Sequence, residues 1–321
     1  MRYSVIIPVY NRPDEIDELL ESLTLQTFTD FEVIIVEDGS DDDCKHVVEK
    51  YQRSLNLKYF YKENSGQGFS RNFGFERATG DYYVVFDSDC IVPKNYFEAV
   101  ESFLKKNPVD CWGGPDKAHQ SFNTIQKAIN YSMTSPFTTG GIRGNRKHVG
   151  KFHPRSFNMG ISKEVFKKTG GYKITRMGED IEFSLRIIEH GFSTALIDEA
   201  YVYHKRRTNL RQFFKQLHFF GRARINIGRF YPDEVKLIHF FPLIFLTGLI
   251  VSIAGLFSSV VIISDLWYFY LGYAILIFTG ALIQEKNPVI ALLAIITSFI
   301  QLTAYGIGFF TEWLREKGII Q

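Results

Sequence analysis

The chain has 321 residues and a formal net charge of +2, so one large domain with an added module is expected and nothing favours nucleic acid as a partner. Its three cysteines, Cys44, Cys90 and Cys111, form no C-x-x-C pair, which argues against a disulfide framework or a zinc knuckle and favours a reducing compartment. The first residues hold only a short apolar core before Pro8 and do not resemble a signal peptide.

Residues 1–205 alternate short apolar runs with helical patterns. Strands are predicted at 3–7, 31–36, 57–61 and 82–86, and helices at 13–26, 44–54 and 68–78. Apolar strands that alternate with helices indicate a parallel sheet covered on both faces, so the predicted class is α/β, doubly wound and mostly parallel. Because ligands bind outside the carboxyl ends of such strands, the loops of interest are 8–12, 37–41, 62–68 and 87–90.

Two common nucleotide-binding patterns do not fit these loops. The first strand runs into PVYNRPDE, which lacks the G-x-G-x-x-G of a dinucleotide-binding domain, and the glycines of SGQGFSRNFG have the wrong spacing. The sequence contains no G-x-x-x-x-G-K phosphate loop. An NAD enzyme and a P-loop NTPase are therefore both disfavoured.

The apolar run YYVVF leads directly into Asp87-Ser88-Asp89. Two interpretations are open: the carboxylates cap a helix that starts near Pro93, or they hold a divalent cation such as Mg²⁺ or Mn²⁺ beside a phosphate. Taken alone, the tripeptide fits the cap better, since acidic residues before a helix are common.

The wider arrangement favours the cation. The segments VIIPVYNR, VEDGS, NSGQGFSRNFGFERATGDYYVVFDSD and GED (178–180) together resemble the family 2 glycosyltransferases of the GT-A fold, over roughly residues 3–205. The resemblance implies a nucleotide-diphosphate sugar donor and a divalent cation, with UDP-sugars favoured. For the donor, the resemblance implies that Pro8, Val9 and Tyr10 cradle the nucleotide base, that Asp38 and Arg71 bond it, and that Asp87 lies near the ribose. For the chemistry, it implies that Asp89 holds the metal, that Asp180 is the catalytic base, and that His204 is a further metal or phosphate ligand. Glu37 stands where the family commonly has Asp, which is expected to spare function because Asp38 carries the base contact.

The chemistry is consistent with one base. A sugar hydroxyl is a weak nucleophile, so a carboxylate that takes its proton accelerates transfer by roughly 10²–10⁴-fold. A base opposite the leaving group suits a single displacement with inversion. Asn158 and Gly160 are candidates near donor or acceptor, and residues 134–156 form either a flap, with Arg143, Arg146 and Lys147 near a phosphate, or an ordinary loop.

Residues 206–239 form a basic amphipathic segment, in which four phenylalanines between 213 and 220 alternate with lysines and arginines. This pattern is either a topology signal or a lipid-binding surface. Both interpretations place residues 1–205, the expected catalytic domain, on the cytoplasmic side of the cell's inner (plasma) membrane.

Residues 240–310 contain only three charged side chains, Asp265, Glu285 and Lys286. Since a span needs about 20 apolar residues, we expect an all-α region of three transmembrane helices at 240–263, 266–283 and 288–310 within residues 240–321. Three spans would put the C-terminus outside, which Arg315 and Lys317 oppose.

The sequence therefore predicts a membrane-anchored, inverting, metal-dependent hexosyltransferase that acts on a hydroxyl of a lipid-linked saccharide during surface polysaccharide assembly. One alternative is transfer to polyprenyl phosphate itself, an anion that needs no base. A second alternative, from another class, is a non-enzymatic membrane protein that senses nucleotide sugars. Processive synthesis is disfavoured because QLHFFGR (216–222) does not match the Q-x-x-R-W of such enzymes.

Overall fold

The computed structural model describes residues 2–119, 121–139, 152–255 and 261–320. The chain divides into two compact units. Of the described residues, 2–119 and 152–205 form the first unit, and 121–139 and those from 206 onward form the second. The second unit includes residues 121–139, although the predicted first domain extends over residues 1–205. The reason is that helix α5 (Thr124–Thr134) turns Ile129 and Met133 into the same apolar cluster as Ala304, far along the chain.

The first unit contains the sheet and the helices that cover it. Its elements in chain order are β1 (Tyr3–Val9), α1 (Pro13–Thr24), β2 (Phe31–Asp38), α2 (Lys45–Tyr51), β3 (Leu57–Lys62), α3 (Gln67–Phe75), β4 (Tyr82–Phe86), β5 (Cys90–Ile91), α4 (Tyr96–Lys106), β6 (Cys111–Gly113), β7 (Asp116–Lys117), β8 (Asn158–Ser162), α7 (Lys163–Thr169), α8 (Glu179–Glu189), β9 (Thr194–Leu196) and β10 (Val202–His204).

The main sheet has the strand order β3-β2-β1-β4-β8-β6-β9. Strands β1 to β4 are mutually parallel, and β8 runs antiparallel to both β4 and β6. A small second sheet joins β5, β10 and β7. The predicted α/β, mostly parallel, doubly wound class is confirmed. The chain goes outward from β1 through β2 to β3 and then returns to β4 on the other side, so the loops after β1 and β4 diverge at a topological switch point.

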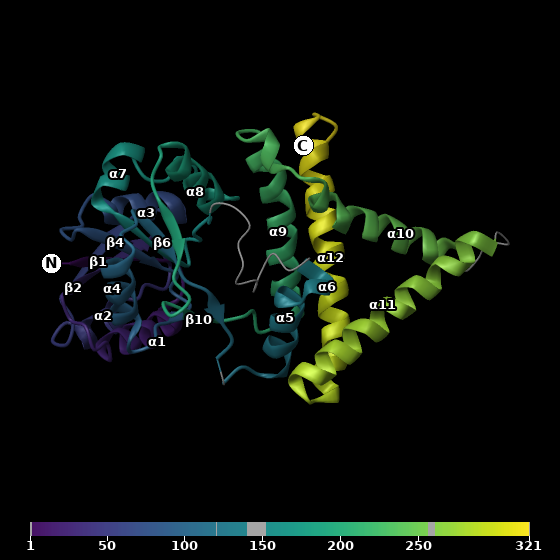
Figure 1. Ribbon diagram of the computed structural model, residues 1–321, viewed down its shortest axis with the longest axis horizontal. Coiled ribbons are helices and arrows are strands. Elements are labelled where there is room, and N and C mark those ends of the chain that lie inside the picture. The colour runs from purple at the N-terminus through teal and green to yellow at the C-terminus, as the bar shows by residue number, and fades with distance from the viewer. Residues whose placement is uncertain (1, 120, 140–151, 256–260, 321) are drawn as a thin grey trace. The chain divides into compact units, whose positions relative to one another are not determined.

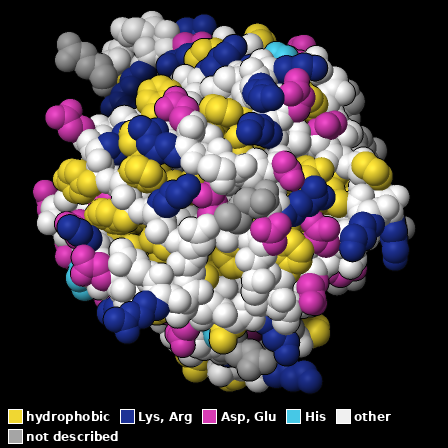
Figure 2. Space-filling view, turned by 90° about the vertical axis from the view of Figure 1, so that its left-hand side faces the viewer, with side chains coloured by type: hydrophobic (Ala, Val, Ile, Leu, Met, Phe, Trp, Pro, Cys, Tyr) yellow, Lys and Arg dark blue, Asp and Glu magenta, His cyan; other side chains and the backbone are white. Residues whose placement is uncertain are grey.

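Both faces of the sheet are buried, as the apolar strands predict. Alternate residues of β1 enter different clusters: Val5 and Ile7 pack with α1, α2 and α4, whereas Ile6 packs with α3, α7 and α8. Figure 1 shows these two helix groups on opposite sides of the sheet. Charges of both signs are interspersed over the face shown in Figure 2, as a net charge near zero leads one to expect.

One buried carboxylate fastens the strands to a turn. Glu32 on β2 accepts hydrogen bonds from the Ser4 hydroxyl on β1 (2.6 Å), from the backbone N–H of Thr79 (2.7 Å) and from Lys58 Nζ (2.7 Å). Burial raises the pKa of Glu32, but the bonds from Lys58, Ser4 and Thr79 outweigh it and lower the pKa to about 2.

The second unit is helical. Besides α5 it contains α6 (Pro136–Thr139), α9 (Leu210–Gly228), the short 3₁₀ helices η1 (Pro232–Glu234) and η2 (Leu237–Phe240), α10 (Phe241–Gly255), α11 (Val261–Glu285) and α12 (Pro288–Glu316). Three stretches are long and apolar enough to cross a membrane, namely Leu237–Gly255, Asp265–Glu285 and Pro288–Glu316. Their number agrees with the sequence prediction.

Two boundaries differ from the prediction. The second apolar stretch begins at Asp265, close to the predicted start at 266, but helix α11 itself begins at Val261 and continues through Asp265. An acidic residue near a helix N-terminus is favoured by the helix dipole and does not end the helix. Helix α12 continues to Glu316, six residues beyond the predicted end at 310, because only isolated charges interrupt its apolar pattern.

Candidate active site

The predicted donor-binding residues gather at the carboxyl ends of β1, β2 and β4. Pro8 and Val9 lie within β1, and Val9 is buried. Tyr10 directly follows the strand and is 49% exposed, so its ring is free to stack on a flat ligand. Asn11 adopts a positive φ of 51°, and its side-chain oxygen accepts the backbone N–H groups of Asp41 (2.9 Å) and Asp42 (3.2 Å). The loops after β1 and β2 are therefore fixed to each other.

Asp38 at the end of β2 is buried and holds the next loop of the sheet edge. Its carboxylate accepts hydrogen bonds from Lys62 Nζ (2.6 Å) and from the backbone N–H groups of Ser65 and Gly66 (both 2.9 Å). Gly66 needs to be glycine here, because its φ is +88° and an added Cβ would lie 2.3 Å from the hydroxyl of Thr175. Asp38 thus organises the loop that would receive the base.

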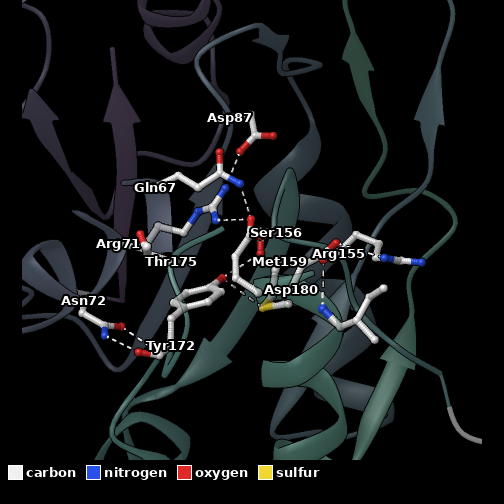
Figure 3. A network of polar contacts seen from close by, with 12 residues as sticks. Gln67, Arg71, Asn72, Asp87, Arg155, Ser156, Met159, Tyr172, Thr175 and Asp180 are labelled. Carbon is white, nitrogen blue, oxygen red and sulfur yellow. Dashed lines mark hydrogen bonds and ion pairs between the residues drawn. The ribbon is translucent and has the colours of Figure 1, made fainter. Parts of the chain in front are cut away.

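Arg71, which the resemblance assigns to the base, is buried inside the first unit. Its Nη2 bonds Asp87 Oδ1 at 2.7 Å, and its Nη1 lies 3.4 Å from Glu179 Oε1. Figure 3 shows Arg71 extending toward Asp87, with the ring of Tyr172 close by. Burial would lower the pKa of Arg71, but Tyr172, Asp87 and Glu179 together raise it, so the guanidinium stays charged.

This bridge joins two motifs that are far apart in the sequence. Asp87 follows β4 and its side chain is 33% exposed, whereas Glu179 opens α8 and its side chain is 6% exposed. Gln67 also donates a hydrogen bond to Glu179. Burial and the charge of Asp180 raise the pKa of Glu179, and Arg71 lowers it. Glu179 is thus the buried member of the Glu179-Asp180 pair, and Arg71 and Gln67 contact its carboxylate.

Asp180 faces the other way and remains partly open. Its Oδ1 accepts the N–H of Ile181 (2.9 Å) and its Oδ2 accepts Arg155 Nη1 (3.1 Å), a contact visible in Figure 3. The side chains of Asp180 and Arg155 are 23% and 39% exposed. Of the two acidic residues, Asp180 is thus the one that solvent or an acceptor can reach.

Asp89 lies in a second cluster of ligating groups. Its two oxygens bond Arg12 Nη1 at 2.6 Å and His204 Nε2 at 3.0 Å, and Cys90 is close enough to complete a group of three potential metal ligands. Hydrogen bonding between β5 and β10 pairs Cys90 with His204 and so brings the histidine beside the carboxylate. Burial raises the pKa of the Cys90 thiol, and the nearby charges of Asp89 and Asp87 add to this effect.

The chemistry of this donor set fits a hard divalent cation. An Asp89 oxygen would suit either Mg²⁺ or Mn²⁺, and the His204 nitrogen would suit Mn²⁺ better than Mg²⁺, whereas a protonated, buried thiol is a poor ligand for either ion. The positively charged guanidinium of Arg12 forms an ion pair with the same Asp89 carboxylate. Burial lowers the pKa of Arg12, but the carboxylates of Asp89, Glu15 and Asp87 together raise it above its ordinary value.

Sequence reasoning missed some of these contacts and misjudged others. Lys62 ends strand β3, whereas Arg12 and Arg155 lie in loops, and each of them reaches its carboxylate only in the folded chain. Asn158 is not near an open site: it is fully buried and bonds the Tyr96 hydroxyl (2.6 Å) and the Ala200 carbonyl (2.8 Å). The contacts suggested for Arg143, Arg146 and Lys147 lie outside the described residues.

Comparison with known proteins decides the family. Residues 4–170, more than half of the chain, match the family model described as Glycosyl transferase family 2. The chain belongs to this family. An uncharacterized glycosyltransferase of Haemophilus influenzae is 32% identical over 215 residues, which cover 64% of this chain and 70% of that protein. For other curated relatives the match is partial, and the chain spans 23% of the length of an uncharacterized glycosyltransferase of Rickettsia felis.

Solved structures share the GT-A fold with this chain. The mannosyltransferase PcManGT from Pyrobaculum calidifontis, in complex with GDP-Man and Mn²⁺, superposes with a TM-score of 0.67 at 18% identity, covering 98% of this chain and 88% of that one. Residues 1–349 of Staphylococcus aureus TarS, in complex with UDP-GlcNAc, superpose with a TM-score of 0.51 at 18% identity, covering 99% and 92%. The expected family, fold and apolar C-terminal helices are thus confirmed.

Proposed function

We propose that this chain is an inverting, metal-dependent hexosyltransferase that moves a sugar from a nucleotide-diphosphate sugar to a hydroxyl of a lipid-linked saccharide. The observation that carries the proposal is the Arg71 bridge, since Asp87 of the predicted donor loop and Glu179 of the predicted base motif bond the same guanidinium. This contact supports a donor site and a general base at the same edge of the sheet.

The donor would bind across the ends of β1, β2 and β4. Tyr10 offers an exposed ring for the base, the Asp38-held loop lines the same edge, and Asp87 is open enough to bond the ribose. Asp89 and His204 would hold the divalent cation, which offsets the negative charge that grows on the departing diphosphate. Related structures contain GDP-Man with Mn²⁺ in one case and UDP-GlcNAc in the other, and we favour UDP-sugars for this chain.

Asp180 would take the proton of the acceptor hydroxyl. Its oxygens are oriented by the Ile181 N–H and by Arg155, and a fixed geometry of this kind is what an efficient general base requires. A single base on the face opposite the leaving group leads to inversion at the anomeric carbon. The buried Glu179 is occupied by Arg71 and Gln67 and would not compete for that proton.

The membrane helices support a membrane-bound acceptor. A soluble acceptor would not require three apolar helices, whereas a lipid-linked saccharide is presented at the bilayer surface. The basic residues that precede the first span favour the cytoplasmic side of the inner membrane for the catalytic unit. Surface polysaccharide assembly is the process in which such an acceptor and such a position would be combined.

One observation favours the alternative acceptor, polyprenyl phosphate. Arg155 is 39% exposed beside Asp180 and could neutralise an incoming phosphate, an acceptor that needs no base. The two acceptors make different demands on Asp180, so a substitution there separates them. A protein that only senses nucleotide sugars would transfer nothing to either acceptor.

The test uses the full-length chain in detergent with a panel of nucleotide sugars, membrane lipid extract and Mn²⁺. Asp180→Asn should slow transfer by roughly 10²–10⁴-fold while nucleotide binding persists, and Asp198→Asn, an exposed control, should behave as wild type. Wild-type transfer by Asp180→Asn would instead identify a phosphate acceptor. Asp89→Asn should remove the Mn²⁺ dependence of donor binding. If the wild-type chain transfers no sugar at all, the remaining hypothesis is a protein that only senses nucleotide sugars.

A further inference from the structure

The helix α12 differs from the other two apolar helices in how much of it the protein covers. In the most apolar stretch of α12, 50% of the residues are buried, against 11% for α10 with η2 and 17% for α11. The buried side of α12 also carries its polar residues, Thr297, Ser298, Gln301 and Glu312. The opposite side exposes Val289, Leu292, Ile296, Phe310 and Trp313. Helix α12 is therefore amphipathic along its length, which is typical of a helix that lies in the membrane interface.

Helix α9 covers the C-terminal half of α12 at backbone contact. A Cβ added to Gly221 of α9 would lie 2.1 Å from the Tyr305 carbonyl oxygen, and one added to Gly308 of α12 would lie 2.0 Å from that of His218. Beyond this crossing, the Glu312 carboxylate accepts hydrogen bonds from Arg222 (2.9 Å) and Arg229 (3.0 Å). Figure 1 shows the two helices running side by side.

Helix α5 covers the N-terminal half in the same way. The Thr297 hydroxyl of α12 donates to the carbonyl oxygen of Ala128 on α5 (3.1 Å). Tyr131 of α5 packs in one cluster with Ala291 and Ala294 of α12. Together α5 and α9 cover one side of α12 from its first turns to its last.

These two covering helices are not suited to the hydrocarbon core. Arg211 and Lys215 of α9 are exposed, and Arg222 and Arg224 lie further along the same helix. If α12 crossed the bilayer with this packing intact, α9 would be drawn in beside it and would place these charges among lipid chains. Basic side chains instead favour the anionic headgroup layer.

We propose that α12 does not span the membrane but lies in the interface, with its apolar stripe toward the lipid chains and with α5 and α9 toward the headgroups and water. The α10–α11 hairpin, which leaves α12 on one side in Figure 1, is then the inserted element, and it enters and leaves the bilayer on the same side. The C-terminus lies on the same side as the catalytic unit, not opposite to it as three spans would require.

Accessibility of single introduced cysteines tests the sidedness. The three native cysteines are buried, so an impermeant maleimide would report on Ile320→Cys in the exposed tail or on Lys45→Cys, an exposed position of the catalytic unit. Each variant is labelled in intact cells and, separately, in inside-out vesicles. Both cysteines should react in the same one of these two preparations. Labelling in opposite preparations would overturn the proposal, whichever side the catalytic unit occupies.

A pair of lysine substitutions tests the depth of α12. Ile296 on α12 and Leu276 on α11 are both exposed apolar residues near the middle of their helices. Leu276→Lys should reduce the membrane-integrated protein at least about tenfold, whereas a lysine at an interfacial position can reach water and should leave the amount nearly unchanged. An equal loss for Ile296→Lys would show that α12 crosses the hydrocarbon core.

Discussion

Replacement of Arg71 by lysine distinguishes two roles for this residue: binding of the nucleotide base, and positioning of Asp87 and Glu179. Two different guanidinium nitrogens contact Asp87 and Glu179, at 2.7 and 3.4 Å, and a single ammonium cannot serve both carboxylates at once. The loss of one hydrogen bond to a charged group costs about 1.5–3 kcal/mol. If that loss appears in the transition state, kcat/KM should fall by roughly 10- to 150-fold.

The assay measures kcat and KM for UDP- and GDP-sugars and the Kd for each free diphosphate. Because the guanidinium of Arg71 is buried and occupied, the loss should fall mainly on kcat, and the ratio of UDP to GDP affinities should stay constant. Arg77→Lys, which alters a partly exposed arginine two residues after the end of the same helix, should change neither quantity. The positioning role would be refuted by a changed base preference with kcat intact.

Three further predictions concern the loop at the sheet edge, the buried carboxylate and the helix pair. Gly66→Ala should lower kcat/KM far more than Gly191→Ala, because both glycines have positive φ but only at Gly66 would the new Cβ collide with a side chain, at 2.3 Å. Glu32 has a folded pKa of about 2 against an ordinary 4.5, so its contribution of about 2–3 kcal/mol is complete above pH 4.5 and is lost as the pH falls toward 2. The melting temperature of Glu32→Gln in detergent should therefore lie below that of wild type at pH 7 and approach it at pH 3, and a constant difference would contradict the assigned pKa. Gly308→Leu should destabilise the helical unit in a detergent melt, whereas Gly272→Leu, with open space around it, should not.

Much of the fold could be predicted from the sequence because its signals are local. Apolar runs such as YYVVF and the patterned helix at 13–26 specify their own secondary structure, and alternating strands and helices restrict the sheet to a parallel arrangement. The long apolar stretches of the tail were found in the same way. Their ends were less certain, because a single charge such as Asp265 does not decide whether a helix stops.

The motifs also placed Asp87, Asp89 and Asp180 at strand ends or at a helix start, which is where the structure has them. Their partners could not be predicted, since an ion pair depends on the separation of side chains and not on their spacing in the sequence. Arg71 is the clearest case. Its motif suggested contact with the base, but burial requires a charged group to be paired, and the nearest carboxylates are Asp87 and Glu179.

The sequence by itself determined the α/β class, the family resemblance and the presence of three apolar helices, because each depends on residues near one another in the chain. Only the tertiary structure decided which side chains pair and which helix faces are covered. Helix α12 is apolar enough by composition to cross a membrane, yet its polar side is occupied by α5 and α9. Composition averages over the faces of a helix, whereas insertion depends on what each face contacts.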